Sequence, residues 1–582
     1  MARYSRARQL VSILLAVLMV AGCLAGCGQG GTSQTGTPSS TAPSTGSTAG
    51  AASPSSAAPE LTGSAANVNP PGEFPICKEP ITIRVGIPQN ANVENYETNK
   101  VTLWYQEKGN FTLEFDLFPT KGSEAQQKLE IMIASGGELP EALIGFGGTI
   151  SEEAVLSYGL EGAVLPLNDY IDTWGYYIHE ALGNLSNKEM LSWMTSADGN
   201  IYYIPKSNEQ LGNMYSLRTW INTQWLDNLG LDMPSTTDEF KDVMLKFLSD
   251  DPNGNGQKDE VGLIGNPAGW RSHAADFLMN AFIYNDTQNR FIVQDGKLVP
   301  AYTQPEWREG LRYLNDLVKN GILMPQSFTM DNDQIKQMTE GGDVATVSAF
   351  TAGGYAVGFG ATNERKYEYA ALPPLTGPGG ASYASFFPDI PQKHFLISKD
   401  AQNPEAIFRW ADLMCSIEGI MRQRWGEPGV DWLEPGPNDK GSLDAIGFEA
   451  KIVPILPWGS VNNSHWSWPC AGMLPVGYAD GQVPPADDPL YAERWIAAAV
   501  PLYMDKEADE TADLFKFTLD EADEIKDMKA TINTYVKESM ALFAVGDRDI
   551  EKDWDSYLKE LDAMGLDRYV ELSQAGYERA KG

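Results

Sequence analysis

Residues 81–87 (ITIRVGI) alternate in side-chain character and are rich in β-branched residues, as a strand is. Residues 112–117 (TLEFDL) alternate in the same way, and residues 141–144 form a short apolar run. Between these runs, residues 103–108 and 124–135 have the spacing of helices. This strand–helix–strand–helix–strand order predicts a parallel sheet with right-handed crossovers, and therefore an α/β fold.

Helical signals continue toward the C-terminus. Residues 236–239 (TTDE) form a capping box, which predicts a helix whose buried stripe begins at Phe240. The last third of the chain is strongly helical. There Trp554, Leu558 and Leu561 recur at the spacing of one helical face, so we expect them to pack against other elements.

Composition restricts the possible partners. The chain has 582 residues, with 43 Lys and Arg against 78 Asp and Glu, a formal net charge of −35. Such an acidic chain is not expected to bind nucleic acid or an anionic membrane through electrostatic attraction. Hydrophobic residues make up 42% of the chain, enough for a substantial core, and five Cys are too few for a disulfide scaffold.

The N-terminus is typical of an exported lipoprotein. Three arginines within residues 3–8 precede an apolar run over residues 10–20, which is shorter than a bilayer span and fits a signal segment. Residues 24–27 (LAGC) resemble a bacterial lipobox, which predicts a signal peptide over residues 1–26 and a lipidated Cys27. Cys23 is an alternative lipidation site.

A tether is expected after the anchor. The chain from Gly28 to about Gly72 consists of Gly, Ser, Thr, Ala and Pro with few other residues, so we expect residues 27–78 to be a disordered linker. An anchor, a tether and a body describe a protein held on the outer face of the cytoplasmic membrane. In that oxidising setting a Cys415–Cys470 disulfide is possible, although the sequence does not establish it.

The body resembles the extracellular solute-binding proteins of ABC transporters, in the oligosaccharide-binding group. The segments that carry the resemblance occur in order along the chain: 129–140 (LEIMIASGGELP), 162–171 (GAVLPLNDYI), 198–205 (DGNIYYIP), 220–231 (WINTQWLDNLGL), 234–240 (PSTTDEF), 369–380 (YAALPPLTGPGG), 403–411 (NPEAIFRWA) and 426–432 (GEPGVDW).

The resemblance implies a two-lobed, periplasmic-binding-protein-like fold of type II, in which each lobe has a mainly parallel sheet flanked by helices. We assign residues 79–212 with 366–412 to lobe 1 and residues 213–365 with 413–582 to lobe 2. The implied function is capture of a carbohydrate between the lobes and its delivery to the permease subunits of an ABC importer, by a protein expected to be a monomer and not an enzyme.

Two other functions stay open at this point: a secreted carbohydrate-active hydrolase, and a sugar receptor that signals to a membrane kinase. No nucleophile elbow, zinc-binding His pair or phosphate-binding loop favours an enzyme. A hydrolase needs only two carboxylates, and 78 acidic residues supply arbitrary pairs.

A calcium loop is the sharpest chemical motif. Residues 251–260 (DPNGNGQKDE) place oxygen ligands at alternate positions, as Ca²⁺ requires, with Gly256 at the sharp turn. The standard twelfth position is Gly262, so Glu260 would have to supply the bidentate carboxylate. This variant resembles the calcium site of alginate-binding receptors of the same group. We expect a structural Ca²⁺ held by Asp251, Asn253, Asn255, the Gln257 carbonyl, Asp259 and Glu260.

Sugar-binding sites combine aromatic side chains, on which the sugar ring packs, with flanking polar groups. The candidates, most of them placed by position in the resembling family, are Trp220, Trp270, Arg271, Glu427, Asp431, Trp432, Trp458, His465 and Trp466. For each Trp, packing in the core is an equal alternative. The net charge argues weakly against a polyanionic ligand, and we expect a neutral oligosaccharide unless the cleft is locally basic.

Overall fold

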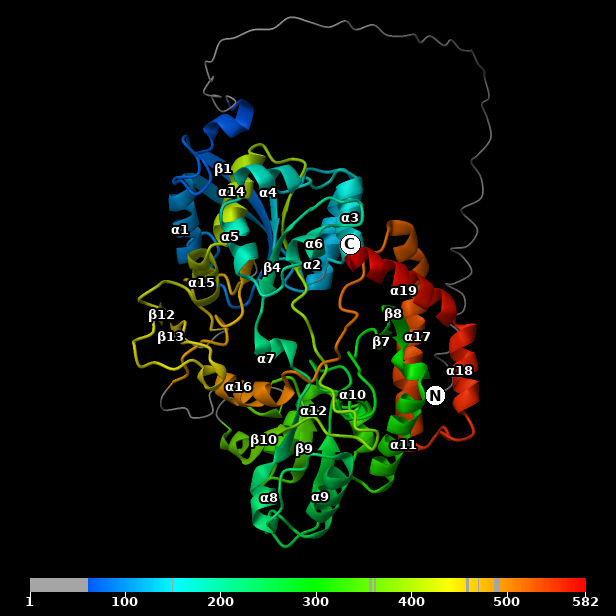
Figure 1. Ribbon diagram of the computed structural model, residues 1–582. Coiled ribbons are helices and arrows are strands. Elements are labelled where there is room, and N and C mark those ends of the chain that lie inside the picture. Colours follow the sequence, from blue (N-terminus) through cyan, green and yellow to red (C-terminus); the bar gives the residue numbers. More distant parts are fainter. Residues whose placement is uncertain are drawn as a thin grey trace, which may run out of the picture. The chain divides into compact units, whose positions relative to one another are not determined.

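The computed structural model describes residues 61–148, 150–354, 358–360, 363–456, 460–468, 470–485 and 492–581. The predicted signal peptide, Cys23, Cys27 and Trp458 lie outside these residues. Figure 1 shows two groups of strands, each surrounded by helices.

The first sheet has six strands in the order β14-β4-β11-β3-β1-β2. Their bounds are β1 (Ile81–Pro88), β2 (Phe111–Phe118), β3 (Ala142–Ile144), β4 (Ile204–Asn208), β11 (Gln392–Ile397) and β14 (Gly472–Leu474). β1 is parallel to both β2 and β3, which confirms the parallel arrangement predicted for residues 81–144. β11 runs antiparallel to both of its neighbours, β3 and β4.

Helices surround this sheet, which has its own buried core. They are α1 (Lys100–Gly109), α2 (Gly122–Ala134), α3 (Glu152–Leu160), α4 (Asn168–Trp174), α5 (Tyr177–Asn184), α6 (Met190–Met194), α14 (Pro404–Met414) and α15 (Ile417–Trp425). The core includes Trp410 and Trp466, whose rings meet edge to face with centroids 6.5 Å apart.

Residues 61–78 differ from the prediction of a disordered tether. They contain a 3-10 helix, Gly63–Asn67, and a bridge between Val68 and Cys77. Val68, Ile76 and Cys77 are buried in the first core. The prediction was wrong here because a few apolar side chains at the end of a polar stretch are enough to fix it against a larger apolar surface.

The second sheet has four strands in the order β10-β5-β9-β6. Their bounds are β5 (Thr219–Asn222), β6 (Val261–Ile264), β9 (Val347–Thr351) and β10 (Tyr369–Leu372). Only β6 and β9 are parallel, because β5 runs antiparallel to both β9 and β10. This sheet is therefore mixed rather than mainly parallel. The chain enters the second sheet through β5 and returns to the first sheet through β11. Neither strand is reached by a strand–helix–strand crossover within its own sheet, so no such crossover makes it parallel to its neighbours.

The helices of this second part are α8 (Thr223–Leu229), α9 (Thr237–Ser249), α10 (Ala274–Met279), α11 (Pro305–Lys319) and α12 (Asn332–Glu340). The predicted capping box is present at the start of α9, where the Thr236 side chain accepts from the Glu239 N–H. Two further antiparallel pairs are described: the hairpin of β7 (Phe291–Gln294) with β8 (Lys297–Pro300), and β12 (Trp432–Leu433) with the more distant β13 (Val453–Pro454).

The lobe boundaries differ from those expected. β10 belongs to the second sheet although residues 366–412 were assigned to lobe 1, and β14 belongs to the first sheet although residues 413–582 were assigned to lobe 2. The chain passes between the sheets over residues 209–218, over residues 373–391 and again after β14. α7 (Leu211–Met214) lies in the first passage and contacts α16 (Ala492–Tyr503), which follows the last one.

The C-terminal region is helical, as predicted, with α17 (Leu519–Val545), α18 (Trp554–Ala563) and α19 (Leu566–Lys581). α17 packs mainly on α11 and α19 of the second core, and its N-terminal part also contacts α3 beside the first sheet. Trp554 and Leu561 are buried in the second core and Leu558 packs against it, which confirms their expected role in packing.

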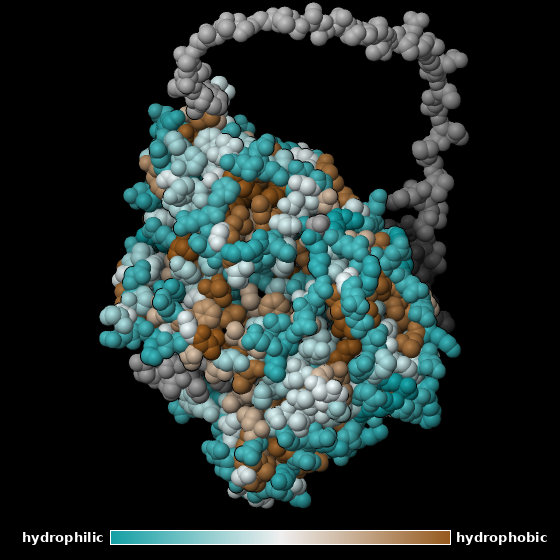
Figure 2. Space-filling view, in the orientation of Figure 1, coloured by the Kyte–Doolittle hydropathy of each residue, from teal (hydrophilic) through white to brown (hydrophobic). Residues whose placement is uncertain are grey.

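Within the described ranges, no helix combines the length and the apolar character of a bilayer span. On the face shown in Figure 2, hydrophilic residues predominate and apolar ones form smaller patches between them. Cys415 and Cys470 are buried free thiols, so the structure does not contain the disulfide considered for them.

Candidate functional site

A cavity of about 640 Å³ is lined by residues of β4 and β11 of the first sheet, of the loop after β6 of the second, and of the passages between the sheets. β4 contributes Lys206, Ser207 and Asn208, and residues 387–391 contribute the passage that leads into β11. Trp270 and Arg271 enter from the loop after β6. This volume is typical of a small-molecule site, and its position at strand ends between two sheets is where α/β proteins usually place one.

Aromatic side chains provide the apolar part of the lining. Trp270 is 50% exposed and therefore offers a free ring face, whereas Phe387 and Trp468 are largely covered. The Arg271 guanidinium lies 3.3 Å from the centre of the Phe387 ring, and the Lys206 ammonium lies 4.8 Å from the centre of the Trp468 ring. Cations at these distances are attracted by the faces of the rings.

Asp389 is the carboxylate in the lining. It accepts a short hydrogen bond from the Ser207 hydroxyl and another from the Asn208 N–H at 2.6 Å. Burial raises the pKa of Asp389 to about 6, although these two hydrogen bonds act in the opposite direction. The side chain is therefore held firmly and changes its charge near neutral pH.

The other charged groups of the lining are cationic: Lys206, Arg271, Lys393 and Arg424. Burial lowers the pKa of Lys206 to about 8, with a further contribution from the positive charge of Arg424. Burial likewise lowers the pKa of Arg271 to about 10. Both shifts show that water solvates these cations poorly.

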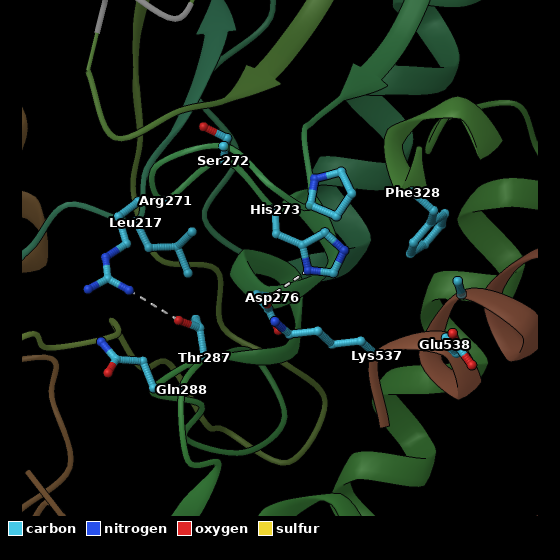
Figure 3. A pocket seen from close by; sticks show the side chains of 13 residues that line it. Leu217, Arg271, Ser272, His273, Asp276, Thr287, Gln288, Phe328, Lys537 and Glu538 are labelled. Atoms are coloured by element: carbon cyan, nitrogen blue, oxygen red, sulfur yellow. Dashed lines mark hydrogen bonds and ion pairs between the residues drawn. The ribbon is translucent and has the colours of Figure 1, made fainter. Parts of the chain in front are cut away.

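A second cavity, of about 410 Å³, shares Arg271 with the first. Figure 3 shows Arg271 directed toward Thr287 on one side, with His273 and Asp276 deeper in the cavity. Lys537 and Glu538 of α17 line it from the opposite side. It is therefore built between the loop after β6 and the long C-terminal helix.

Asp276 joins two basic side chains in the wall of this second cavity. It contacts His273 Nδ1 at 2.7 Å and the Arg290 guanidinium at 3.1 Å. Burial alone would raise the pKa of Asp276, but Arg290 and His273 lower it well below its usual range. Asp276 is thus a buried anion with its charge already compensated, which favours a structural role.

Of the predicted ligand residues that the structure describes, Trp270 and Arg271 alone line the cavity between the sheets. Trp220 and Trp466 are 1% and 0% exposed in the second and first cores, so neither presents a face to a ligand. The Trp220 Nε1 donates to the Ala352 carbonyl and the Trp466 Nε1 donates to the Thr102 hydroxyl. For these two residues the alternative of core packing is the correct one.

The other predicted ligand residues lie elsewhere. Asp431 accepts from the Glu427 N–H at 2.7 Å, and Glu427 pairs with Lys100 at 3.1 Å. Trp432 lines a separate cavity of about 530 Å³ with Tyr478. His465 is buried, and its ring nitrogens contact Asn462 and the Ser467 N–H.

Several lining residues were not predicted. Lys206, Ser207 and Asn208 directly follow the segment 198–205, and polar residues at the end of an apolar strand were a usable signal. Asp389 has no such signal, because residues 373–391 lack a regular pattern. Arg424 lies in the last turn of α15, where a basic residue is ordinary.

The predicted calcium loop forms a tight turn with Gly254 and Gly256 at positive φ. Asp251 accepts from the Asn255 and Gly256 N–H groups at 3.1 and 3.0 Å, and Gln257 donates its N–H to the Asn255 side chain. In the described part of the chain, no three His, Cys, Asp or Glu side chains converge as a metal site. Ca²⁺ would therefore depend on amide and main-chain oxygens as well as carboxylates.

The surroundings of the Glu260 carboxylate indicate whether this loop can bind a cation. One of its carboxylate oxygens is buried without a hydrogen-bond partner in the structure. Burial raises the pKa of Glu260, and Asp259 and Asp251 add to the shift by charge repulsion. Asp259 accepts from the amides of Asn253 and Asn255, each at 3.2 Å. A buried carboxylate oxygen without a hydrogen-bond partner, in a loop that also carries Asp251 and Asp259, fits the demand of a divalent cation.

Comparison with known proteins decides the family. Residues 93–420 match the family model described as bacterial extracellular solute-binding protein. The chain belongs to this family. Its mixed α/β architecture with two helix-flanked sheets is the fold of the solved solute-binding proteins that it resembles.

This solute-binding protein is 26% identical over 468 residues to the fructooligosaccharide ABC transporter substrate-binding protein FusA of Streptococcus pneumoniae, covering 78% of this chain and 83% of FusA. A shorter match, 29% identical over 220 residues, covers 36% of this chain and 39% of the lipoprotein LipO of Bacillus subtilis.

Solved structures show the same fold. FusA in complex with kestose has a TM-score of 0.66 at 21% identity, covering 86% of this chain and 99% of that one. An extracellular solute-binding protein from Bifidobacterium longum subsp. infantis has a TM-score of 0.71 at 19% identity, covering 87% of this chain and 99% of that one. The alginate-binding protein AlgQ2 without calcium ion has a TM-score of 0.59 at 19% identity, covering 87% and 100%.

Proposed function

We propose that this solute-binding protein captures an oligosaccharide in the cavity between its sheets and delivers it to the permease subunits of an ABC importer. The observation that carries the proposal is the cavity of about 640 Å³ whose lining combines Trp270, Phe387 and Trp468 with polar groups of β4, of β11 and of the loop after β6. Sugars bind to such surfaces because their C–H faces pack on aromatic rings while their hydroxyls need hydrogen-bond partners. The similarity to FusA, named for fructooligosaccharide transport, supports the carbohydrate class.

Binding would work by shifting a conformational equilibrium. The lining comes from β4 and β11 on one side and from the Trp270–Arg271 loop on the other, so one ligand contacts both parts. Such a ligand favours the closed arrangement by its higher affinity for that state, and the closed protein would be recognised by the permease. We propose that the receptor acts as a monomer.

Titration calorimetry of the purified protein against a panel of oligosaccharides tests the binding function. We expect one class to bind, and Trp270→Ala to weaken its binding at least about tenfold, equivalent to about 1.4 kcal/mol. Trp193→Ala is the matched control, because Trp193 lies in α6 and does not line the cavity. Detectable cleavage of the bound sugar would instead support a hydrolase, and absence of binding across the panel would refute the proposal.

We also propose that Cys27 carries the lipid that holds the protein on the outer face of the cytoplasmic membrane. The support is the lipobox-like segment at residues 24–27 and the strong negative charge, which cannot itself attract an anionic membrane. Cys27→Ser should release the protein from the membrane fraction while Cys23→Ser should not. Release by Cys23→Ser alone would move the anchor to Cys23.

Ca²⁺ bound by the loop 251–260 is proposed as a structural cofactor. Asp251, Asp259 and Glu260 would supply carboxylates, Asn253 and Asn255 side-chain oxygens, and Gln257 its carbonyl. Solved relatives of the same fold include a FusA EF-hand mutant and AlgQ2 without calcium ion, which supports the cofactor. We expect a chelator to lower the melting temperature of the protein, and Glu260→Gln to abolish that response. An unchanged melting temperature after chelation would refute the calcium assignment.

A further inference from the structure

The cavity between the sheets has a charge opposite to that of the protein. The chain carries a formal net charge of −35, yet among the residues that the structure describes the cavity is lined by four cationic side chains and one carboxylate, Asp389. In an acidic protein, a cluster of cations in a concave, partly water-excluded surface marks a place where negative charge is accommodated. The cations of the lining differ in whether the protein itself provides an ion-pair partner for them.

Lys393 is compensated. Its ammonium pairs with Glu152 at 3.3 Å, and both side chains are largely buried. Asp389 accepts hydrogen bonds from the Ser207 hydroxyl and the Asn208 N–H, and the positive charge of Lys206 acts on it through space. Among the described residues, Asp389 therefore forms no ion pair with Lys206 or Arg271.

Lys206 has no ion pair within the described residues. Its ammonium lies over the Trp468 ring, 4.8 Å from the centre, and the Arg424 guanidinium lies 5.1 Å from the centre of the same ring. Two cations thus share one aromatic ring at the wall of the cavity. Their mutual repulsion contributes to the lowered pKa of Lys206, and the first cause of that shift is burial.

Arg271 faces the cavity from the other sheet, and the described residues give it no ion pair either. Its partners are the Thr287 hydroxyl at 3.4 Å and the Phe387 ring at 3.3 Å. The nearby carboxylates serve other groups: Asp276 pairs with Arg290, and Asp286 accepts main-chain N–H groups of residues 288–290. Arg271 is therefore available to an anion from outside.

Poorly solvated cations without an ion pair destabilise the empty cavity, and an anionic group of a ligand would offset that cost. A neutral sugar would leave Lys206 and Arg271 without an ion pair, with only the more distant charges of Asp389, Asp286 and Asp276 acting on them. The arrangement also provides an exposed ring, Trp270, beside Arg271, so a sugar face and a negative substituent could be bound together.

We propose that the oligosaccharide taken up by this protein is acidic, and that its carboxylate or sulfate groups are bound by Lys206 of β4 and by Arg271 of the loop after β6. This inference rests on the proposed carbohydrate-binding function and replaces the neutral ligand expected from the net charge. It assigns ligand specificity to residues that the sequence motifs did not indicate.

Matched probes test the charge directly. Trigalacturonate and its methyl ester share the same sugar chain and differ in the charge of their carboxyl groups. In calorimetric titration we expect trigalacturonate to bind at least about tenfold more tightly than the ester, with a difference that shrinks as NaCl is raised. A sulfated trisaccharide and kestose complete the set, and separate a sulfate ligand from a carboxylate ligand and from a neutral one.

Variants locate the effect. Lys206→Gln should weaken binding of the acidic probe at least about tenfold, and by a larger factor than it weakens binding of the methyl ester, while Lys206→Arg should retain most of the affinity. Lys319→Gln is the matched control, because Lys319 is exposed on α11 and the change in net charge is the same. Circular dichroism confirms that each variant is folded.

The outcomes separate this inference from the proposed function. Tighter binding of trigalacturonate or of the sulfated probe, lost in Lys206→Gln, supports it and identifies the anionic group. Equal or tighter binding of kestose or the methyl ester, unaffected by Lys206→Gln, overturns the acidic ligand but leaves carbohydrate binding intact. Absence of binding by every sugar, acidic or neutral, overturns both.

Discussion

Asp389 shows how a single side chain couples the cavity to pH. It lies in the passage into β11, fixed by hydrogen bonds from Ser207 and Asn208 on β4. Burial raises its pKa to about 6, so the folded state binds a proton more tightly than the unfolded chain, whose Asp pKa is about 3.9. Folding therefore loses stability as pH rises from about 4 through 6.

Asn does not titrate in this range, so Asp389→Asn should remove this loss of stability with rising pH. The amide oxygen of Asn can still accept both hydrogen bonds. At pH 7 we expect the variant to be more stable by roughly 2 to 3 kcal/mol, at about 1.4 kcal/mol per pKa unit, and equal to the parent near pH 4. Denaturant unfolding at pH 4, 5, 6 and 7 measures this. A stability difference that stays constant across these pH values would contradict the assigned shift. Asp333→Asn, at an exposed position of α12, is the control.

Residue type alone could not separate ligand contacts from core in this chain. Trp220, Trp270 and Trp466 are equivalent as letters, yet only Trp270 is half exposed at the cavity. The difference depends on which face of a strand or loop the side chain occupies, and this is set by contacts between distant segments. Lys206 and Asp389 are 183 positions apart in the sequence, and it is the fold that places both in one lining.

α17 is the element that touches both cores. Its Leu519 packs against the first core, whereas Ile525 and Ile532 are buried in the second. A capping box begins the helix: the Thr518 hydroxyl accepts from the Glu521 N–H, and the Glu521 side chain accepts from the Thr518 N–H at 2.9 Å. The cap therefore stabilises the end of the helix that reaches the first sheet.

Thr518→Ala removes this cap and should cost about 1 kcal/mol of stability. Because α17 contacts α3 through its N-terminal part, we expect hydrogen exchange to accelerate mainly in the first two turns of α17. Thr534→Ala provides the control at an exposed position in the middle of the same helix, where Ala is at least as favourable as Thr. Equal effects of the two substitutions would show that the cap contributes nothing.

Local pattern predicted the elements well where neighbours in sequence are neighbours in space. The strands and helices expected over residues 81–144 appear as β1, α1, β2, α2 and β3 with small shifts at their ends. The directions of β5 and β11 could not be predicted in this way. Each of them pairs with strands from distant segments, and alternation of side chains is the same in parallel and antiparallel strands.

At the scale of the whole molecule, charge is the dominant long-range term. A net charge of −35 produces repulsion within the folded protein, and salt screens it as the Debye length falls from about 30 Å at 0.01 M to below 10 Å above 0.1 M. We expect the melting temperature to rise by about 2 °C or more between 10 and 200 mM NaCl at pH 7. A melting temperature that falls over this range would mean that exposed ion pairs outweigh the repulsion. KCl serves as a control for ion-specific effects.

The position of the thiols has a practical consequence. Cys77, Cys415 and Cys470 are all buried in the first core, and burial raises the pKa of each of them. The second core as described contains no cysteine. A thiol reagent added to the native protein should therefore react with these three cysteines only when the first core opens. Its rate of labelling would report the opening of one half of the receptor without any engineered probe, and the slowing of that rate by a bound ligand would show how strongly the ligand joins the two halves.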